Sequence, residues 1–326
     1  MSVALEEVRY RSAGSEDERS VVSFLRECGY DSDERFWSWN HRECPHGETI
    51  VELAVAQDRI VGHYGVQPRR LRLNGQSIQA GLAIHAAIHP HFRGLSILRE
   101  LLNRTLKRCR EAGLSFIYGY PRREVWLMYW KLFGWASMGE LVTLELPLAG
   151  GRFAPGPGDP ISFRRAAFDE AYDRFPHGSL FAGLNHVVRD RAYLRWRFEN
   201  HPRVEYELAE VRDRSGSLLA YLILKRYQKE EKRFGHVVEA DVRRGNLPVY
   251  RWLLEAALSR FQQSGAGIAS CWMLKNSPLF APLQEMGFRA QGFTTYAGYC
   301  RAQPGLDARG LDLHEWHMTM GDSDAF

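Results

Sequence analysis

The chain has 326 residues, of which 45% are hydrophobic and 25% are charged. A chain of this length exceeds one ordinary compact domain and has enough apolar mass to bury substantial cores, so we expect two folded domains. The formal charge of +4 permits an anionic ligand, but no long run of Lys or Arg supports binding to nucleic acid.

The cysteines and the N-terminal residues bear on the cellular compartment. The five cysteines are scattered and form no CxxC pair, which is typical of reduced thiols and implies neither a disulfide framework nor a metal site. The first residues, MSVALEEVRYRS, lack the apolar core of a signal peptide, and no stretch is as apolar as a membrane span. We therefore expect a cytoplasmic protein without a membrane span or a bound metal.

The first half of the chain alternates between helical and β patterns. A strand at 8–11 precedes a helix that ends near Gly29, and Asp33 or Ser32 begins a second short helix. The period then changes to that of strands, and Asn74-Gly75 is a strong hairpin signal. The expected strands are 49–57, 59–66, 69–73 and 76–88, followed by a helix ending at Gly113, a strand at 114–119, a helix at 124–133 and a strand at 141–146.

Residues 86–113 contain the stretch around which the chain is organised. A short apolar strand leads into the basic turn Arg93-Gly94-Leu95-Ser96, and apolar residues at helical spacing follow. The first amides of a helix lack intrahelical partners and carry partial positive charge, so such a turn favours a phosphate group. Taken alone, this stretch is explained better by an ordinary strand-to-helix connection, because one Arg-Gly turn is weak evidence.

The second half repeats the first in outline. The motif WNHRECP at 39–45 is answered by WRFENHP at 196–202, and KLFGW at 131–135 by QEMGF at 284–288. Residues 150–160 are rich in Gly and Pro and are typical of a linker. The predicted organisation is a domain at 1–149, a linker at 150–160, a degenerate copy at 161–300 and a tail at 301–326.

The ordered motifs HPHFRGLSIL, IYGYP and KLFGW resemble those of GNAT-superfamily acyltransferases. The resemblance implies a mixed α/β fold of two fused GNAT-like units, each with a mostly antiparallel central sheet flanked by helices. FWSWNHRECP, YLRWRFENHP and the terminal WHMTMGDSDAF are similar to the tandem branch found with bacterial polysaccharide or secondary-metabolite genes, and more distantly to Eis-like enzymes.

The family's phosphate turn has the form Arg/Gln-x-x-Gly-x-Gly/Ala and holds acyl-CoA. Here Ser96 and Leu98 stand where small residues are usual. In the second copy Pro248 stands where an amide donor is needed, so we expect no second CoA site. The resemblance implies that acetyl-CoA or a longer acyl-CoA contacts Ala87, Ile88, His89, Arg93, Gly94, Leu95, Ser96, Ile97 and Leu98.

Acyl transfer to an amine needs a base, an oxyanion donor and an acid. His85 stands where GNAT enzymes often place the base, although a polar side chain satisfied on the sheet explains it equally well. Relatives use a Tyr as the acid where this chain has Trp130, so Tyr129 and Tyr120 are the candidates, with Tyr118 as a further option. The carboxylate of Phe326 is a second candidate base, because some relatives place the chain terminus in the active site; a merely solvated tail is the simpler account.

These expectations combine into an acyl-CoA-dependent N-acyltransferase acting on a small-molecule amine, such as an amino sugar or an amino-acid-like metabolite. Two alternatives stay open. One is a catalytically silent acyl-CoA-binding or interaction module, suggested by Ser96, Leu98 and the missing Tyr. The other is a FemX-like aminoacyl transferase, to which the small positive charge gives little support.

Overall fold

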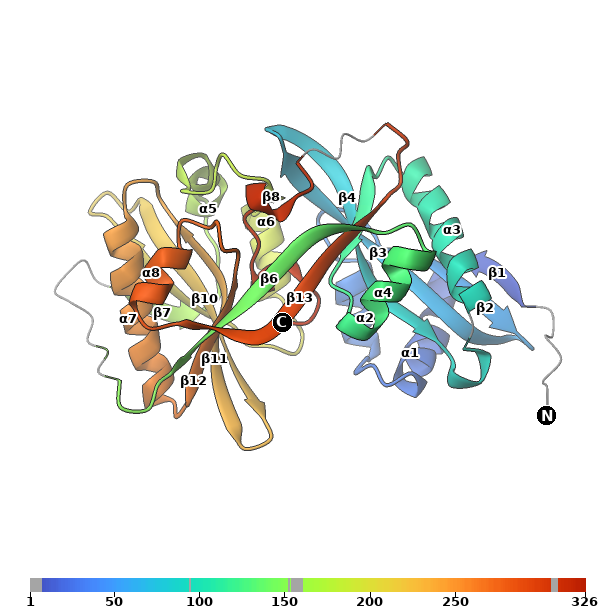
Figure 1. The fold of residues 1–326 in the computed structure, drawn as a ribbon, viewed down its shortest axis with the longest axis horizontal. Helices are drawn as coiled ribbons and strands as arrows, with labels where there is room; N and C mark the ends of the chain where they lie inside the picture. Colours follow the sequence, from blue (N-terminus) through green and yellow to red (C-terminus); the bar gives the residue numbers. More distant parts are fainter. Residues whose placement is uncertain (1–7, 94, 152, 154–160, 306–309) are drawn as a thin grey trace. The chain divides into compact units, whose positions relative to one another are not determined.

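The computed structural model describes residues 8–93, 95–151, 153, 161–305 and 310–326 (Figure 1). The chain divides into two compact units. The first comprises Met1–Leu71, Ser77–Ser137 and Ala297–Ala308, and the second comprises Arg72–Gln76, Met138–Tyr296 and Arg309–Phe326.

The first unit is a mixed sheet with helices on both faces. Strands β1, β2 and β3 are antiparallel, β4 runs parallel to β5, and the end of β13 pairs antiparallel with β5. The elements are β1 (Arg9–Ser12), α1 (Glu18–Glu27), α2 (Glu34–His41), β2 (Ile50–Ala56), β3 (Arg59–Leu73), β4 (Gln76–Ile88), α3 (Leu95–Glu111), β5 (Phe116–Gly119) and α4 (Arg123–Leu132), with 3-10 turns at Ser15–Asp17 and Pro90–Phe92.

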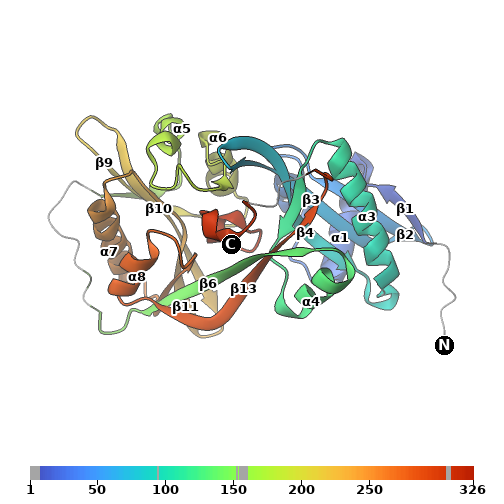
Figure 2. The ribbon, with the colours of Figure 1, turned by 45° about the horizontal axis from the view of Figure 1, so that its top comes forward.

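The alternation of side chains along β2 decides which helix covers which face of this sheet. Leu53 and Val55 pack into one cluster with apolar residues of α1 and α2. Glu52 points the other way, and its carboxylate binds Arg104 at 2.9 Å and Arg108 at 3.3 Å, both on α3. Because successive strand residues face opposite sides, α1 and α3 cover opposite faces of the sheet (Figure 2).

The second unit repeats this arrangement. Strands β7, β9, β10 and β11 are successive antiparallel neighbours, and β11 runs parallel to β12 after the helix α7. The elements are β6 (Ala136–Pro147), β7 (Ser162–Arg165), α5 (Ala171–Arg174), β8 (His186–Val187), α6 (Arg191–Leu194), β9 (Glu207–Arg212), β10 (Leu218–Lys229), β11 (Lys232–Val242), α7 (Leu247–Gln263), β12 (Ile268–Met273), α8 (Phe280–Glu285) and β13 (Arg289–Arg301), with short helical turns at Phe175–Gly178, Arg195–Glu199, Leu313–Glu315 and Met320–Asp322.

The last strand of each repeat pairs in the unit of the other repeat. β6 follows α4 in the chain but pairs with β12, where Leu144 lies opposite Cys271. β13 follows α8 but ends against β5, where Gly298 lies opposite Gly119. The boundary between the units therefore falls at 137/138, inside β6, whereas the sequence predicted 149/150. Most of the predicted linker lies outside the described residues.

The faces of β11 are chemically distinct. Ala240 and Val242 belong to the apolar core that packs on α7. Gly235 lets Phe261 of α7 approach so closely that an added Cβ would lie 2.3 Å from its ring. Glu239 and Asp241 alternate with these residues and face the side away from α7, so two buried carboxylates lie on the other face of the sheet.

The mixed α/β class predicted from the sequence is confirmed, and most local signals hold. Asp33 caps α2 by accepting a hydrogen bond from the Phe36 amide at 2.7 Å. The helix predicted after Ser15 begins instead at Glu18, after a 3-10 turn in which Asp17 accepts the Gly14 amide. Among the described residues, none of the helices has both the length and the apolar composition that crossing a bilayer requires.

Candidate active site

Strand β4 is paired with β5 over only part of its length. In the described residues their parallel ladder consists of Gly81–Ile117 and Leu82–Tyr118, while β4 continues to Ile88. His85 lies in this continuation with φ of 49°, in the left-handed region that side chains other than Asn, Asp and Gly seldom adopt. The local irregularity re-aims the imidazole and marks a candidate functional position.

The surroundings of His85 keep its imidazole neutral. Its ring lies edge-on to Tyr30 at 5.2 Å and stacks near His41 at 5.5 Å, measured between ring centroids. Burial lowers the pKa of His85 to about 4. The ring therefore carries no charge at neutral pH and is present in its basic form, and its buried Nδ1 has no hydrogen-bond partner in the described part of the chain.

Two further histidines, which the sequence analysis did not single out, complete a buried cluster. His63 Nδ1 lies 2.7 Å from the carbonyl oxygen of His85, and His41 Nδ1 lies 3.0 Å from that of Trp37. A carbonyl only accepts, so each Nδ1 carries the hydrogen and each Nε2 is a bare acceptor. Burial is the main cause that lowers both pKa values, that of His63 to about 3.

The cluster contains residues from α2, β3 and β4, so no local sequence signal could have joined them. The sequence analysis named His41 only as a member of the repeated motif WNHRECP and gave it no functional role. Within the described ranges no group of three His, Cys, Asp or Glu residues is arranged to hold a metal ion, these three histidines included.

The predicted phosphate turn follows β4 directly. The 3-10 turn Pro90–Phe92 leads to the exposed Arg93, and α3 begins at Leu95. Ser96 is exposed in the first turn of this 17-residue helix, so the free amides of its N-terminus are available to an anion. Gly94 lies outside the described residues.

The remaining residues predicted to contact the donor differ in what they can offer. Ala87 and Ile97 are buried, so their side chains pack in the interior. Ile88, His89 and Leu98 are half-buried. The His89 amide is taken by the Val61 carbonyl at 2.9 Å, on the β3 side of the strand. The edge of β4 on the β3 side is therefore occupied. The other edge of residues 83–88, on the side of β5, is the part of β4 that suits an extended ligand.

Residues 9–138 match the family described as the acetyltransferase (GNAT) domain. This part of the chain is therefore similar to GNAT domains. The match confirms the predicted GNAT-type acyltransferase, and a GNAT domain supports transfer of an acyl group from acyl-CoA to an amine. The particular branch of tandem GNAT proteins and the relation to Eis-like enzymes stay predictions. No curated protein matches the chain.

Solved structures share the fold over nearly the whole chain. A tandem GNAT protein from the clavulanic acid biosynthesis pathway has 13% identity and a TM-score of 0.64, with 92% of this chain and 100% of that chain covered. A GCN5-related N-acetyltransferase from Anabaena variabilis has 13% identity and a TM-score of 0.68, with 91% and 73% covered. The N-myristoyltransferase of Saccharomyces cerevisiae, solved with myristoyl-CoA, has 10% identity and a TM-score of 0.60, with 91% and 80% covered. The predicted fold of two fused GNAT-like units is confirmed by these similarities.

The tyrosines proposed as the acid lie at different depths in the GNAT domain. Tyr129 is buried and packs edge-on against Trp135 at 5.0 Å and against Phe133 at 5.7 Å. Burial raises the pKa of Tyr129 to about 12, and Tyr30 contributes to this rise. Tyr30 therefore neighbours both Tyr129 and His85. Tyr120 is half-buried and lies edge-on to Tyr118 at 6.2 Å.

The C-terminal residue Phe326 belongs to the second unit. Its ring lies edge-on to Trp272 at 5.0 Å and to His236 at 5.6 Å. Arg197 donates to the carbonyls of Gly321 and Ser323, each at 3.1 Å, and to the terminal carboxylate. The tail is thus docked rather than solvated, and its carboxylate is paired with a buried guanidinium.

The second GNAT-like unit contains a buried ionic network that the sequence analysis also missed. Arg189 binds Glu239 at 2.8 Å and Asp322 at 2.7 Å, and Thr319 donates to Glu239 at 2.8 Å. The three ionic residues come from β11, the tail and the segment after β8. In the sequence, the acidic residues near the end of the chain were the only sign of this ionic network. The same residues were equally consistent with a solvated tail.

Proposed function

We propose that the protein is an acyl-CoA-dependent N-acyltransferase that transfers an acetyl or longer acyl group to the amine of a small molecule, such as an amino sugar or an amino-acid-like metabolite. The observation that carries this proposal is the end of β4. There the strand extends past its ladder with β5, bends at His85 and leads directly into the N-terminus of α3.

Three groups of residues would bind the donor. The backbone of β4 beyond its described ladder with β5 suits the extended pantetheine arm, in the manner of an added strand, and there the Ala86 carbonyl accepts a hydrogen bond from Tyr30 Oη at 3.2 Å. The amides of the first turn of α3 suit the pyrophosphate, and Arg93 adds a full positive charge beside them. Leu98 is only half-buried, and its bulk would limit how closely the phosphates approach the helix.

His85 would act as the base. Its neutral imidazole accepts a proton from the substrate ammonium, directly or through a water molecule, and the free amine nitrogen attacks the thioester carbonyl carbon. The C–S bond then breaks and the thiolate takes up a proton. Tyr129 or Tyr120 would supply that proton; the raised pKa of Tyr129 keeps its hydroxyl protonated but makes it a weaker acid than an ordinary Tyr.

The terminal carboxylate of Phe326 is the second candidate base. Its pairing with Arg197 stabilises the charged form and so weakens its basicity.

The test uses His85→Asn, because Asn tolerates the positive φ at this position better than Ala does. With acetyl-CoA as donor and a panel of small amines as acceptors, turnover should fall by about 100-fold or more, while the affinity for acetyl-CoA is unchanged. His91→Asn, at an exposed position on the adjoining turn, is the matched control and should keep full turnover. Undiminished turnover of His85→Asn would exclude His85 as the base.

A silent acyl-CoA-binding module is the second candidate, and one observation favours it. Tyr129 is only 7% exposed and packs against Phe133 and Trp135, so its ring is part of the core. Binding of acetyl-CoA, seen as a rise in Tm, without release of free thiol from any acceptor would support this candidate. Absence of any Tm response to acetyl-CoA or longer acyl-CoAs would contradict both candidates.

A further inference from the structure

We propose that the second unit contains a binding site for a small primary ammonium group, at the side of β11 that faces away from α7. The proposal goes beyond acyl transfer, because it concerns binding in the second unit and does not depend on the chemistry of the first.

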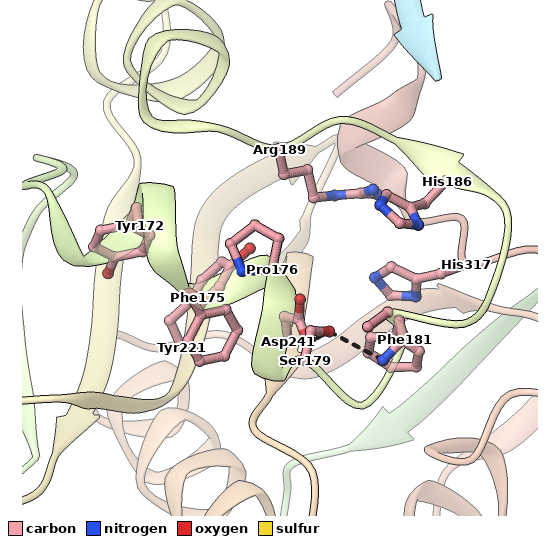
Figure 3. A pocket seen from close by; sticks show the side chains of 11 residues that line it. Tyr172, Phe175, Pro176, Ser179, Phe181, His186, Arg189, Tyr221, Asp241 and His317 are labelled. Carbon is pink, nitrogen blue, oxygen red and sulfur yellow. Dashed lines mark hydrogen bonds between the residues drawn. The ribbon is translucent and has the colours of Figure 1, made fainter. Parts of the chain in front are cut away.

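Two cavities that share lining residues define the site, and Figure 3 shows the residues around the smaller one. The smaller one, of about 20 Å³, is lined by Ser179, His186, Tyr221, Asp241 and aromatic neighbours. The larger one, of about 390 Å³, shares four lining residues with it. A volume near 20 Å³ holds one group the size of water, and an ammonium group has that size. The larger cavity leaves room for the rest of a small ligand. The shared lining residues are Pro176, Ala182, His186 and Arg189.

Asp241 is the charged group of the smaller cavity. Its carboxylate accepts hydrogen bonds from Ser179 Oγ at 2.6 Å and from the Val242 amide at 2.7 Å. The residue is only 7% exposed, and in the described part of the chain no cationic side chain forms an ion pair with it. Burial raises the pKa of Asp241 to about 6; the nearby Glu239 adds to this rise, while His317 and the hydrogen bonds from Ser179 and Val242 oppose it. A buried carboxylate in this condition attracts a cation.

The nearest guanidinium is already committed to other carboxylates. Arg189 lines the cavities but binds both Glu239 and Asp322. His317 also lines the smaller cavity, with its Nε2 3.5 Å from Glu239, and its ring contributes to the electrostatic surroundings of Asp241. Among the described residues, Arg189 is therefore engaged by Glu239 and Asp322 and forms no ion pair with Asp241.

The other lining groups suit N–H donors and a compact cation. His186 Nδ1 donates to the Leu184 carbonyl at 2.7 Å, which leaves Nε2 as an acceptor, and burial lowers the pKa of His186 to about 4. Rings of Tyr172, Phe175 and Tyr221 form one wall, and aromatic faces attract cations. An ammonium group offers three donors to these acceptors, whereas a quaternary ammonium offers none and is too large for the smaller cavity.

The experiment measures the Tm of the full chain in methylammonium chloride, tetramethylammonium chloride and KCl at equal ionic strength, without acyl-CoA. We expect Tm to rise with methylammonium concentration along a saturation curve and the other two salts to have no comparable effect. Asp241→Asn keeps the shape and removes the charge, and it should abolish the response. Glu231→Gln, at an exposed turn, removes one carboxylate elsewhere in the unit and should keep the response.

A second variant covers the case in which Asp241→Asn does not fold. Ala182→Leu places a larger side chain at an exposed position that lines both cavities, so it should block methylammonium without altering any charge. Equal responses to methylammonium and KCl, or a full response in either cavity variant, would overturn the proposal. Because no acyl-CoA is present, this outcome is separate from the outcome of the acyl-transfer test.

Discussion

The Nδ1 atom of His63 donates a hydrogen bond to the backbone carbonyl of His85 over 2.7 Å. His63 is fully buried on β3, and His85 holds a positive φ on β4. This bond therefore stabilises the backbone conformation that orients the His85 ring, and it makes His63 a positioning residue for the proposed base.

Replacing His63 tests this positioning role. His63→Leu removes the donor and should slow turnover by about 10–100-fold, because small misplacements of a catalytic group are costly. His63→Asn retains an N–H donor and should recover part of the loss. The affinity for acetyl-CoA should be unchanged in both variants. A rise in KM with unchanged turnover would instead indicate a role in binding.

The buried histidines of the first unit should make stability depend on pH. Burial places the folded pKa of His63 at about 3 and that of His85 at about 4, below the ordinary value of 6.5 that applies in the unfolded chain. The unfolded state therefore binds more protons between these values, so the free energy of unfolding is largest above pH 6.5 and falls as the pH drops toward 3. Urea unfolding at a series of pH values measures this. A double variant, His41→Leu with His63→Leu, should flatten the dependence, and an unchanged slope would contradict the assignment.

Arg93 should contribute to donor affinity through its charge. Arg93→Ala should weaken acetyl-CoA binding by about 5–10-fold, the effect of losing one solvent-exposed, charge-assisted phosphate contact. Lys107→Ala is the matched control. It removes one positive charge from the later turns of α3, so the two variants have the same net charge. Calorimetric titration compares them. Equal affinities in both variants would place the phosphate site elsewhere.

The buried pairing of Arg189 should dominate the stability of the second unit. Arg189→Met leaves Glu239 and Asp322 buried without their partner and should lower the free energy of unfolding by about 3–5 kcal/mol. Arg214→Met, at an exposed position, should change it by less than about 0.5 kcal/mol. Denaturant titration of the full chain provides both values. A small effect of Arg189→Met would mean that the carboxylates are protonated in the folded state.

Extending the chain beyond Phe326 separates a structural tail from a catalytic one. A short extension of about three residues moves the terminal charge away from Arg197 and should lower the free energy of unfolding by about 1–2 kcal/mol. If His85 is the base, turnover should be unchanged at a temperature where the variant is fully folded. Turnover that is slower by about 100-fold or more in the folded variant would assign the base to the terminal carboxylate instead.

Local signals in the sequence determined much of the architecture. The Asn74-Gly75 pair predicted the hairpin between β3 and β4, Asp33 predicted the start of α2, and the apolar spacing before Gly113 predicted α3. The paired motifs around Trp39 and Trp196 predicted the duplication. Turn chemistry, capping and periodicity act over a few residues, so they can be read directly from the chain.

Only the tertiary structure decided how the two repeats share their strands and which polar side chains meet. The exchange of β6 and β13, the gathering of His41 and His63 at His85, and the facing of Asp241 toward a cavity all depend on pairing between distant segments. Neither strand order nor the burial of a polar side chain is encoded in local spacing. These features arise when the sheets form. The register of strand pairing then decides which residues of a strand face the apolar core and which face the opposite, polar side.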